Sequence, residues 1–212
     1  MPGHVVKYAP IPAGERLHQG EILAGLALVR QVLDSIGTND IDVSEVSLPF
    51  TVVLTQDCDL AQDASARTIE TQAFHNPALV NDPEFQKKHS IAPKYKVDNV
   101  VFCELVTTAN LKASAAQQKE LWKRVTQNLD PRFHCLEAVP AEHDSLGQGL
   151  PNLGCDFKRF FTVATDEVYR RIELGQIVRR TYLKTPYAEH LLHRFCNFQA
   201  RIPLPENHDV PL

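Results

Sequence analysis

Two carboxylates and one thiol stand next to one another near the middle of the first half of the chain. Asp57 and Asp59 flank Cys58 directly after an apolar run. A thiolate can act as a nucleophile when a histidine serves as its base. The histidines considered for that role are His75, His134 and His190. Two adjacent acids oppose this chemistry, because negative charge beside a thiol raises its pKa. The candidate catalytic residues are Asp57, Cys58 and Asp59.

The same three residues also allow a metal site or a purely structural role. Carboxylate oxygens bind hard cations and zinc, but no His-x-x-x-His pair accompanies them here. His134 and Cys135 lack the closely spaced partner pairs of structural zinc sites, so we predict no metal and no other cofactor. In the structural interpretation, Asp59 caps the turn after a strand and Cys58 fills the core.

A second candidate site is basic. The chain has a net charge of −4, yet residues 151–201 hold nine Lys or Arg against five Asp or Glu. A helix after Pro186 would bring three basic side chains to one side, at about 100° per residue, and two arginines precede it. The predicted phosphate- or nucleic-acid-binding residues are Arg179, Arg180, His190, Arg194 and Arg201. The alternatives are a solvated face, or Arg194 paired with Asp59 or Asp156.

Apolar runs indicate the elements that position these residues. Thr51–Thr55 is continuous and β-branched, which is typical of a strand buried on both faces. Further strands are expected over Glu21–Gln31, Val97–Val106, Arg132–Val139, Asp156–Val163 and Gln176–Leu183. Helices are expected over Ala109–Asn128, Asp166–Ile172 and from Pro186 onwards. The fold class is therefore α+β, with a bent antiparallel sheet or small SH3-like barrel and flanking helices.

Residues 1–212 are interpreted as one domain with an insertion. Residues 61–96 are polar and interrupted by Pro77, Pro83 and Pro93, which predicts a loop-rich insertion with one short helix near 84–89. Residues 36–47 contain Gly-Thr-Asn-Asp and are expected to form a loop.

Composition limits the classes of protein that fit. Hydrophobic residues make up 43% and charged residues 23% of the chain, which are ordinary globular values. No apolar run is long enough to cross a membrane, and no secretory signal is visible, so we expect a cytoplasmic protein that does not bind membranes. The five cysteines are an odd number without a signal peptide, which predicts reduced thiols.

Several segments together resemble a known group of proteins. They are Gln19-Gly-Glu-Ile-Leu, residues 52–60, Arg132-Phe-His-Cys-Leu, residues 156–163 and residues 186–195. They resemble uncharacterised bacterial and phage-associated proteins that carry a (Thr/Ser)-Gln-x-Cys-Asp signature after a strand. The spacing between Gly20-Glu-Ile and Val52-Val-Leu-Thr is also similar to that of SH3-like barrels of the MazF/PemK toxin type. This second likeness is the reason for expecting a strand over Glu21–Gln31.

Two functions follow as expectations. The first is a non-catalytic intracellular binding or regulatory protein, whose partner is nucleic acid or a protein encoded nearby. The resemblance adds an expected link to mobile elements or phage defence. The second is a nuclease-like or other hydrolytic enzyme that uses the acidic cluster with nearby Arg and His. A ribonuclease of the toxin type would use Thr55, Asp57 and Arg194. An open pocket shared by Asp57, Asp59 and Arg194 would favour the enzyme, whereas a closed ion pair would favour the binding protein.

Overall fold

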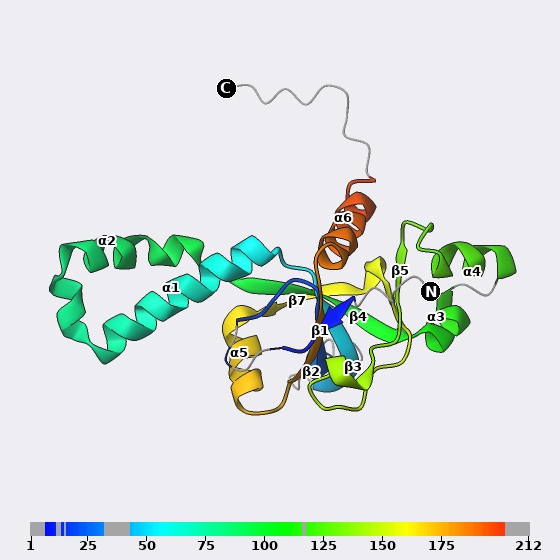
Figure 1. The fold of residues 1–212 in the computed structure, drawn as a ribbon, viewed down its shortest axis with the longest axis horizontal. Helices are drawn as coiled ribbons and strands as arrows, with labels where there is room; N and C mark the ends of the chain where they lie inside the picture. The colour runs from blue at the N-terminus through cyan, green and yellow to red at the C-terminus, as the bar shows by residue number, and fades with distance from the viewer. Residues whose placement is uncertain (1–6, 12–13, 15, 32–42, 116–117, 202–212) are drawn as a thin grey trace, which may run out of the picture.

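A strongly curled antiparallel sheet forms the body of the molecule (Figure 1). The computed structural model describes residues 7–11, 14, 16–31, 43–115 and 118–201. The strands are β1 Tyr8–Ala9, β2 Glu21–Gln31, β3 Val43–Val53, β4 Asn99–Thr107, β5 Phe133–Leu136, β6 Leu153–Asp156, β7 Phe160–Ala164 and β8 Val178–Leu183. Their order is β1-β8-β2-β3-β4-β6-β5, and β7 pairs with β4. The predicted α+β class with a bent antiparallel sheet and flanking helices is confirmed.

Helices cover both faces of this sheet. They are α1 Asp57–His75, α2 Pro83–Ile91, α3 Thr108–Ala115, α4 Lys119–Thr126, α5 Thr165–Glu173 and α6 Tyr187–Gln199. One core cluster joins the sheet to Leu191 of α6, and a second joins it to Val168 of α5 and Leu60 of α1. A smaller cluster holds α3 and α4 against β5. The centre of the sheet is therefore buried on both faces, as its apolar strands require.

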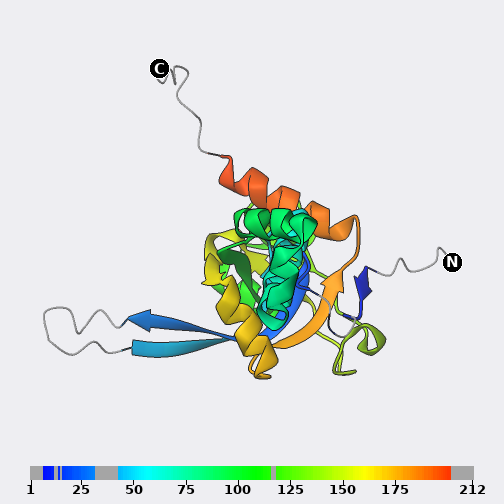
Figure 2. The same cartoon turned by 90° about the vertical axis from the view of Figure 1, so that its left-hand side faces the viewer.

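Strand β3 illustrates this two-sided burial. Val52 belongs to the cluster of α6, whereas Val53 belongs to the cluster of α5, and both are fully buried. The predicted strand at Thr51–Thr55 is confirmed up to Val53, where β3 ends. The strand begins at Val43, so the loop expected over residues 36–47 is wrong from Val43 onwards, and its residues 36–42 lie outside the described residues. The pairing of β3 with β2 from Ile22 to Gln31 holds these residues extended, and the hairpin reaches away from the body (Figure 2).

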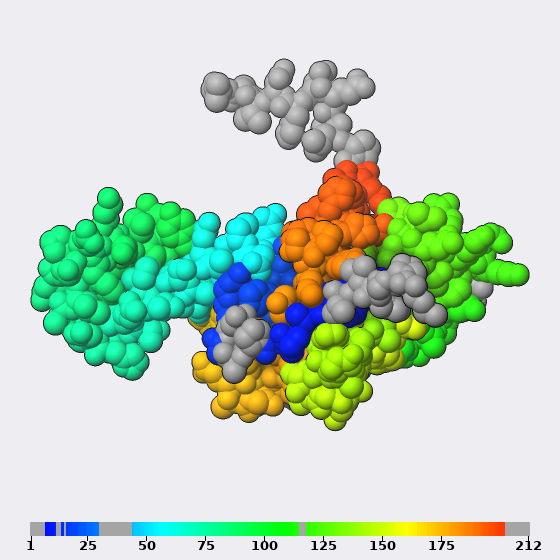
Figure 3. Space-filling model, in the orientation of Figure 1, coloured from blue at the N-terminus to red at the C-terminus, as the bar shows by residue number. Residues whose placement is uncertain are grey.

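The insertion at 61–96 is helical, and the prediction of a loop-rich segment is wrong. It contains most of α1, the 3₁₀ helices Pro77–Asn81 and Ala92–Tyr95, and α2 between them. Its prolines occupy the first turns of these short helices, where a missing N–H costs nothing. Asp82 caps α2 by accepting hydrogen bonds from the N–H groups of Glu84 at 2.8 Å and Phe85 at 3.0 Å. We call the segment from Asp57 to Tyr95 the helical arm, since it projects from the sheet (Figures 1 and 3).

Two other elements differ in extent from the prediction. The single helix expected over Ala109–Asn128 is divided into α3 and α4. The strand expected over Asp156–Val163 is interrupted by a 3₁₀ turn at Phe157–Arg159, because the Asp156 carboxylate accepts the N–H of Lys158 at 3.1 Å. The strands over Glu21–Gln31 and in β4 and β8, and the helices α5 and α6, are confirmed within a few residues.

Candidate functional site

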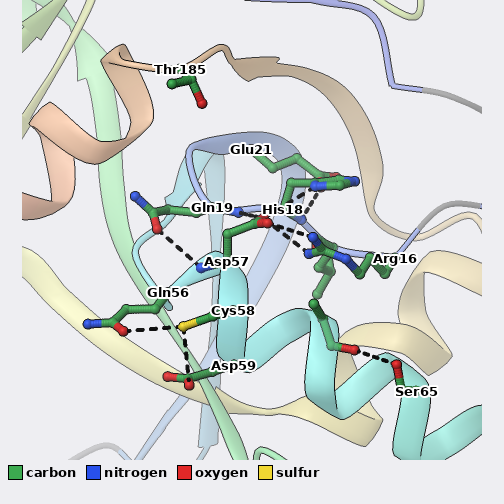
Figure 4. Close-up of polar contacts among 12 residues, drawn as sticks. Arg16, His18, Gln19, Glu21, Gln56, Asp57, Cys58, Asp59, Ser65 and Thr185 are labelled. Atoms are coloured by element: carbon green, nitrogen blue, oxygen red, sulfur yellow. Dashed lines mark hydrogen bonds and ion pairs between the residues drawn. The ribbon is translucent and has the colours of Figure 1, made fainter.

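Asp57 is the first residue of α1, and its carboxylate is held from several directions (Figure 4). Arg16 donates from Nη1 at 3.1 Å and from Nη2 at 2.5 Å to its two oxygens. The Gln19 backbone N–H donates to the same carboxylate at 3.2 Å, and the Asp57 N–H donates to the Gln19 Oε1 at 3.1 Å. The Nδ1 of His18 lies 3.3 Å from Asp57 Oδ1. Residues 16–19 are thereby clamped to the start of α1.

A second ion pair lies beside this clamp. Glu21 has no exposed surface, and it accepts hydrogen bonds from Arg179 Nε at 2.5 Å and Nη2 at 2.9 Å. The His18 backbone N–H donates to the same carboxylate at 3.0 Å. Arg179 Nη2 also donates to the Arg16 carbonyl at 2.6 Å, and the His18 ring stacks on Tyr182 with 5.4 Å between centroids. The two pairs thus join residues 16–21 to α1 and to β8.

The arginines near this network are paired with carboxylates. A cavity of about 830 Å³ is lined in part by Arg16, Arg67 and Arg179. Arg16 binds Asp57, Arg179 binds Glu21, and Arg67 donates to the buried Asp63 at 2.7 Å. The carboxylates neutralise the positive charge of these arginines. A phosphodiester substrate would need that charge at the cavity wall to bind. The arrangement is therefore a network of ion pairs in which each of these three arginines has a carboxylate partner.

Cys58 and Asp59 point away from this network. Both are exposed, and the Cys58 thiol contacts Gln56 Oε1 at 3.5 Å and Asp59 Oδ1 at 3.6 Å. The three predicted catalytic residues are consequently divided between a clamp on one side of α1 and solvent on the other (Figure 4). Within the described part of the chain, no three His, Cys, Asp or Glu side chains gather closely enough to hold a metal ion. All five cysteines are free thiols, as predicted.

Arg194 does not pair with Asp59 or Asp156, and both of these predicted pairs are wrong. Its guanidinium donates instead to the backbone carbonyls of Asn128, of Asp130 at 2.6 Å and of Phe133 at 2.9 Å. Asp156 binds Arg132 through Nε at 2.8 Å and Nη2 at 2.5 Å. The helix α6 does carry Arg194 to the edge of the core, but the acceptors there are carbonyls of the segment that enters β5.

The remaining predicted phosphate-binding residues occupy separate environments. Arg180 is buried and donates to the buried Asp144 from Nε and Nη2, both at 2.7 Å. His190 lines a cavity next to β5, whereas the Arg201 guanidinium lies over the Phe198 ring, 4.6 Å from its centroid. With Arg179 bound to Glu21, the five basic residues do not form one continuous stripe.

The clamp residues Arg16, His18, Gln19 and Glu21 were not anticipated as site residues. They lie in and just after an irregular N-terminal segment, and the Arg16–Asp57 contact spans 41 positions in sequence. The one visible signal is the charged Glu21 at the start of an apolar strand, since a buried carboxylate requires a cation.

Comparison with known proteins adds no assignment. No family model, curated protein or solved structure matches this chain. The likeness to the (Thr/Ser)-Gln-x-Cys-Asp group therefore stays a prediction. No helix in the described residues has the length and apolar character needed to cross a membrane.

Replacing Asp57 with asparagine tests whether this cluster is structural or catalytic. Burial alone raises the pKa of Asp57, but hydrogen bonds from Arg16 and the Gln19 backbone outweigh it and hold the pKa below its usual value. At neutral pH we expect Asp57→Asn to lower the free energy of unfolding by about 1 kcal/mol, since the carboxylate is half-exposed. Because a depressed pKa stabilises only the ionised form, this difference should disappear as the pH falls below about 4.

Urea unfolding over this pH range, together with a single-stranded RNA cleavage assay, measures both properties. Asp59→Asn is the matched control, because Asp59 is exposed in the same first turn of α1 and should lose only the smaller contribution of the helix dipole. RNA cleavage by the wild type that Asp57→Asn abolishes at unchanged stability would contradict the structural interpretation.

Proposed function

We propose that the protein is a non-catalytic binding protein whose helical arm receives an acidic, amphipathic helix of a partner protein. The observation that carries this proposal is a groove on the arm. It has a volume of about 460 Å³. One side is formed by α1, and the other side is formed by α2 together with the 3₁₀ helix that follows it. The apolar residues of its lining are Ala61, Ala66, Ile69, Ile91, Ala92 and Tyr95, and the polar ones are Gln62, Ser65 and Lys88.

Apolar side chains at the groove are unusually accessible. Ile91 is 39% exposed and Tyr95 is 47% exposed. An amphipathic helix that places residues i, i+3/4 and i+7 in such a groove would remove this surface from water. Nucleic acid fits less well, because the floor of the groove is mostly aliphatic and offers base edges few hydrogen-bonding groups.

The charge around the groove supports an acidic partner. Residues 83–96 contain Lys87, Lys88, Lys94 and Lys96 against a single acid, Glu84. Lys88 lines the groove itself, Lys87 and Lys94 are exposed, and Lys96 pairs with Glu70 at 3.0 Å. Carboxylates that flank the apolar face of a partner helix would lie close to these lysines. Their attraction would raise the association rate and orient the partner helix in the groove.

The closed network at Asp57 favours the same conclusion. Arg16 and Arg179 are each bonded to a carboxylate by two nitrogens, which leaves the hydrolytic alternative without an observation in its favour. The bacterial or phage-associated setting, including a link to phage defence, belongs to this proposal through the sequence resemblance alone.

Selection from a display library of short helical peptides tests the proposal with the full chain as bait. Counter-selection uses Ile91→Asp, which places a charge at the groove on an already exposed position. We expect the enriched peptides to carry apolar residues at i, i+3/4 and i+7 with Asp or Glu beside them. Peptides that bind both forms equally, or that are basic, would contradict it, as would Ile91-dependent binding of a single-stranded oligonucleotide.

Ile91→Asp should weaken the binding of a selected peptide at least tenfold. Burying an isoleucine side chain contributes about 1.5–3 kcal/mol, and about 1.4 kcal/mol corresponds to a factor of ten in Kd. Fluorescence anisotropy of the labelled peptide measures this change. Leu174→Asp is the matched control, because Leu174 is 58% exposed just after α5 and should leave the affinity unchanged. Equal losses in both variants would show that the groove is not the binding surface.

A further inference from the structure

A second cavity lies on the side of the molecule away from the helical arm. It has a volume of about 520 Å³ and is lined by residues of α4, of β5 and of the start of α6. In Figure 1, α4 and β5 lie at the opposite end of the molecule from the arm. This volume lies within the range of small-molecule sites in proteins, which is about 300–1,000 Å³. None of the clamp residues at Asp57 lines it, so its role is independent of that network.

Two imidazoles form part of the cavity wall. His134 is only 4% exposed, and its Nδ1 has no hydrogen-bond partner among the described residues. The His190 ring meets it edge-on, with 5.6 Å between centroids. Burial, aided by Arg194 and His190, lowers the pKa of His134 to about 3, and burial with Arg194 and His193 lowers the pKa of His190. Both rings are therefore neutral at pH 7 and can donate or accept a hydrogen bond.

The rest of the lining combines aromatic rings with aliphatic and neutral polar side chains, and it carries no net charge. Trp122 and Tyr187 supply aromatic rings from α4 and α6. One face of each ring lies near a lysine, with Lys112 Nζ 5.8 Å from the Trp122 centroid and Lys7 Nζ 5.5 Å from the Tyr187 centroid, so a ligand would stack on the other face. The charged residues of the wall are Lys7 and Glu137, which pair at 2.6 Å and compensate each other. Gln127 and Asn152 add neutral side-chain amides. Such a wall suits a flat, neutral molecule with hydrogen-bonding edges better than it suits a phosphate or a carboxylate.

We propose that this cavity binds a neutral planar heteroaromatic ligand of the nucleobase or nucleoside class. The ligand would stack against the rings of Trp122 or Tyr187 and hydrogen-bond at its edge to the imidazoles. Base–aromatic stacking tolerates different bases, so discrimination between them would come from the amides and imidazoles. A phosphate on the ligand would gain little, because Lys7 is already paired with Glu137.

Intrinsic fluorescence provides a direct test, because Trp122 is the sole tryptophan of the chain. The full protein would be titrated with adenosine, guanosine, cytidine and uridine, with excitation beyond the nucleoside absorption band. We expect saturable quenching by at least one nucleoside. Tyr187→Ala and His190→Ala should each raise the Kd at least tenfold, while the corresponding monophosphate should bind no more tightly than the nucleoside.

Phe74→Ala is the matched control, because Phe74 is 82% exposed on the helical arm and should leave the titration unchanged. Circular dichroism would establish that each variant is folded, and His190→Gln provides a second, milder change at the same wall. Quenching that is absent or linear in wild type would overturn the proposal. Saturable quenching that neither Tyr187→Ala nor either His190 variant alters would overturn it as well.

Discussion

Replacing Arg180 with alanine should lower the free energy of unfolding by about 3–5 kcal/mol. Arg180 and Asp144 are both buried, and two hydrogen bonds of 2.7 Å join them. Asp144 also accepts the backbone N–H groups of Gln148 at 3.0 Å and Gly149 at 2.9 Å. The pair therefore fastens the loop after residue 143 to β8, and removing the arginine leaves a buried carboxylate without its cation.

A double-mutant cycle with Asp144→Ala, measured by urea unfolding, separates the pair from its surroundings. The double variant should lose less than the sum of the two single losses. Arg159→Ala is the matched control, because its pair with Glu104 is largely exposed on the arginine side and should contribute at most about 1 kcal/mol. Small, additive losses for Arg180 and Asp144 would mean that their charges are accessible to water or to a ligand.

Acid should weaken the same interaction. The hydrogen bonds from Arg180 hold the pKa of Asp144 below its usual value. A carboxylate with a depressed pKa in the folded state stabilises the protein above its unfolded-state pKa, and this contribution is lost as the pH falls below about 4. The difference between wild type and Asp144→Ala should shrink over that range.

Replacing Glu21 with alanine should have an effect of similar size, about 3–5 kcal/mol. The Glu21 side chain is fully enclosed, whereas Arg179 keeps only 15% of its side chain exposed. Without Glu21, the guanidinium of Arg179 and the backbone N–H of His18 would both lose their acceptor. Glu21→Gln retains the shape but not the charge, so it should recover only part of the loss.

Urea unfolding measures this prediction, with Glu142→Ala as a control at an exposed glutamate. Limited proteolysis near Arg16 adds a local readout, since the segment 16–21 should become more accessible when its anchor on β8 is removed. A loss below about 1 kcal/mol would place Glu21 and Arg179 in a water-filled site and would return the hydrolytic alternative to consideration.

The sheet was predictable because its strands carry strong local signals. Thr51–Val53 is apolar without interruption, and the structure buries Val52 and Val53 on opposite faces. The last helix was also predictable, since Leu191, Phe195 and Phe198 recur on one face and pack together in the core beneath α6. An uninterrupted apolar run matches a strand buried on both faces, and a helical repeat of apolar residues matches a helix buried on one face.

The helical arm was not predictable from periodicity, because α1 buries only Leu60, Asp63 and Ala66 along its 19 residues. A helix that covers so little core carries no apolar stripe. The three prolines that follow α1 in the arm also favour the prediction of loops, because proline is frequent in loops. The partner of Asp57 was missed for a different reason. Arg16 is joined to it by tertiary structure alone, whereas Arg194 meets carbonyl groups whose positions no side-chain pattern encodes.

Amide hydrogen exchange of the full chain, with and without a selected acidic peptide, tests the proposed binding surface most directly. Peptide binding should slow exchange in residues 61–69 and 88–95, which form the two sides of the groove on the arm. Ile91→Asp should remove this protection while leaving the exchange of the sheet unchanged. Protection confined to residues 16–21 and 57–59 would place binding at the ion-pair network instead and would contradict the proposal.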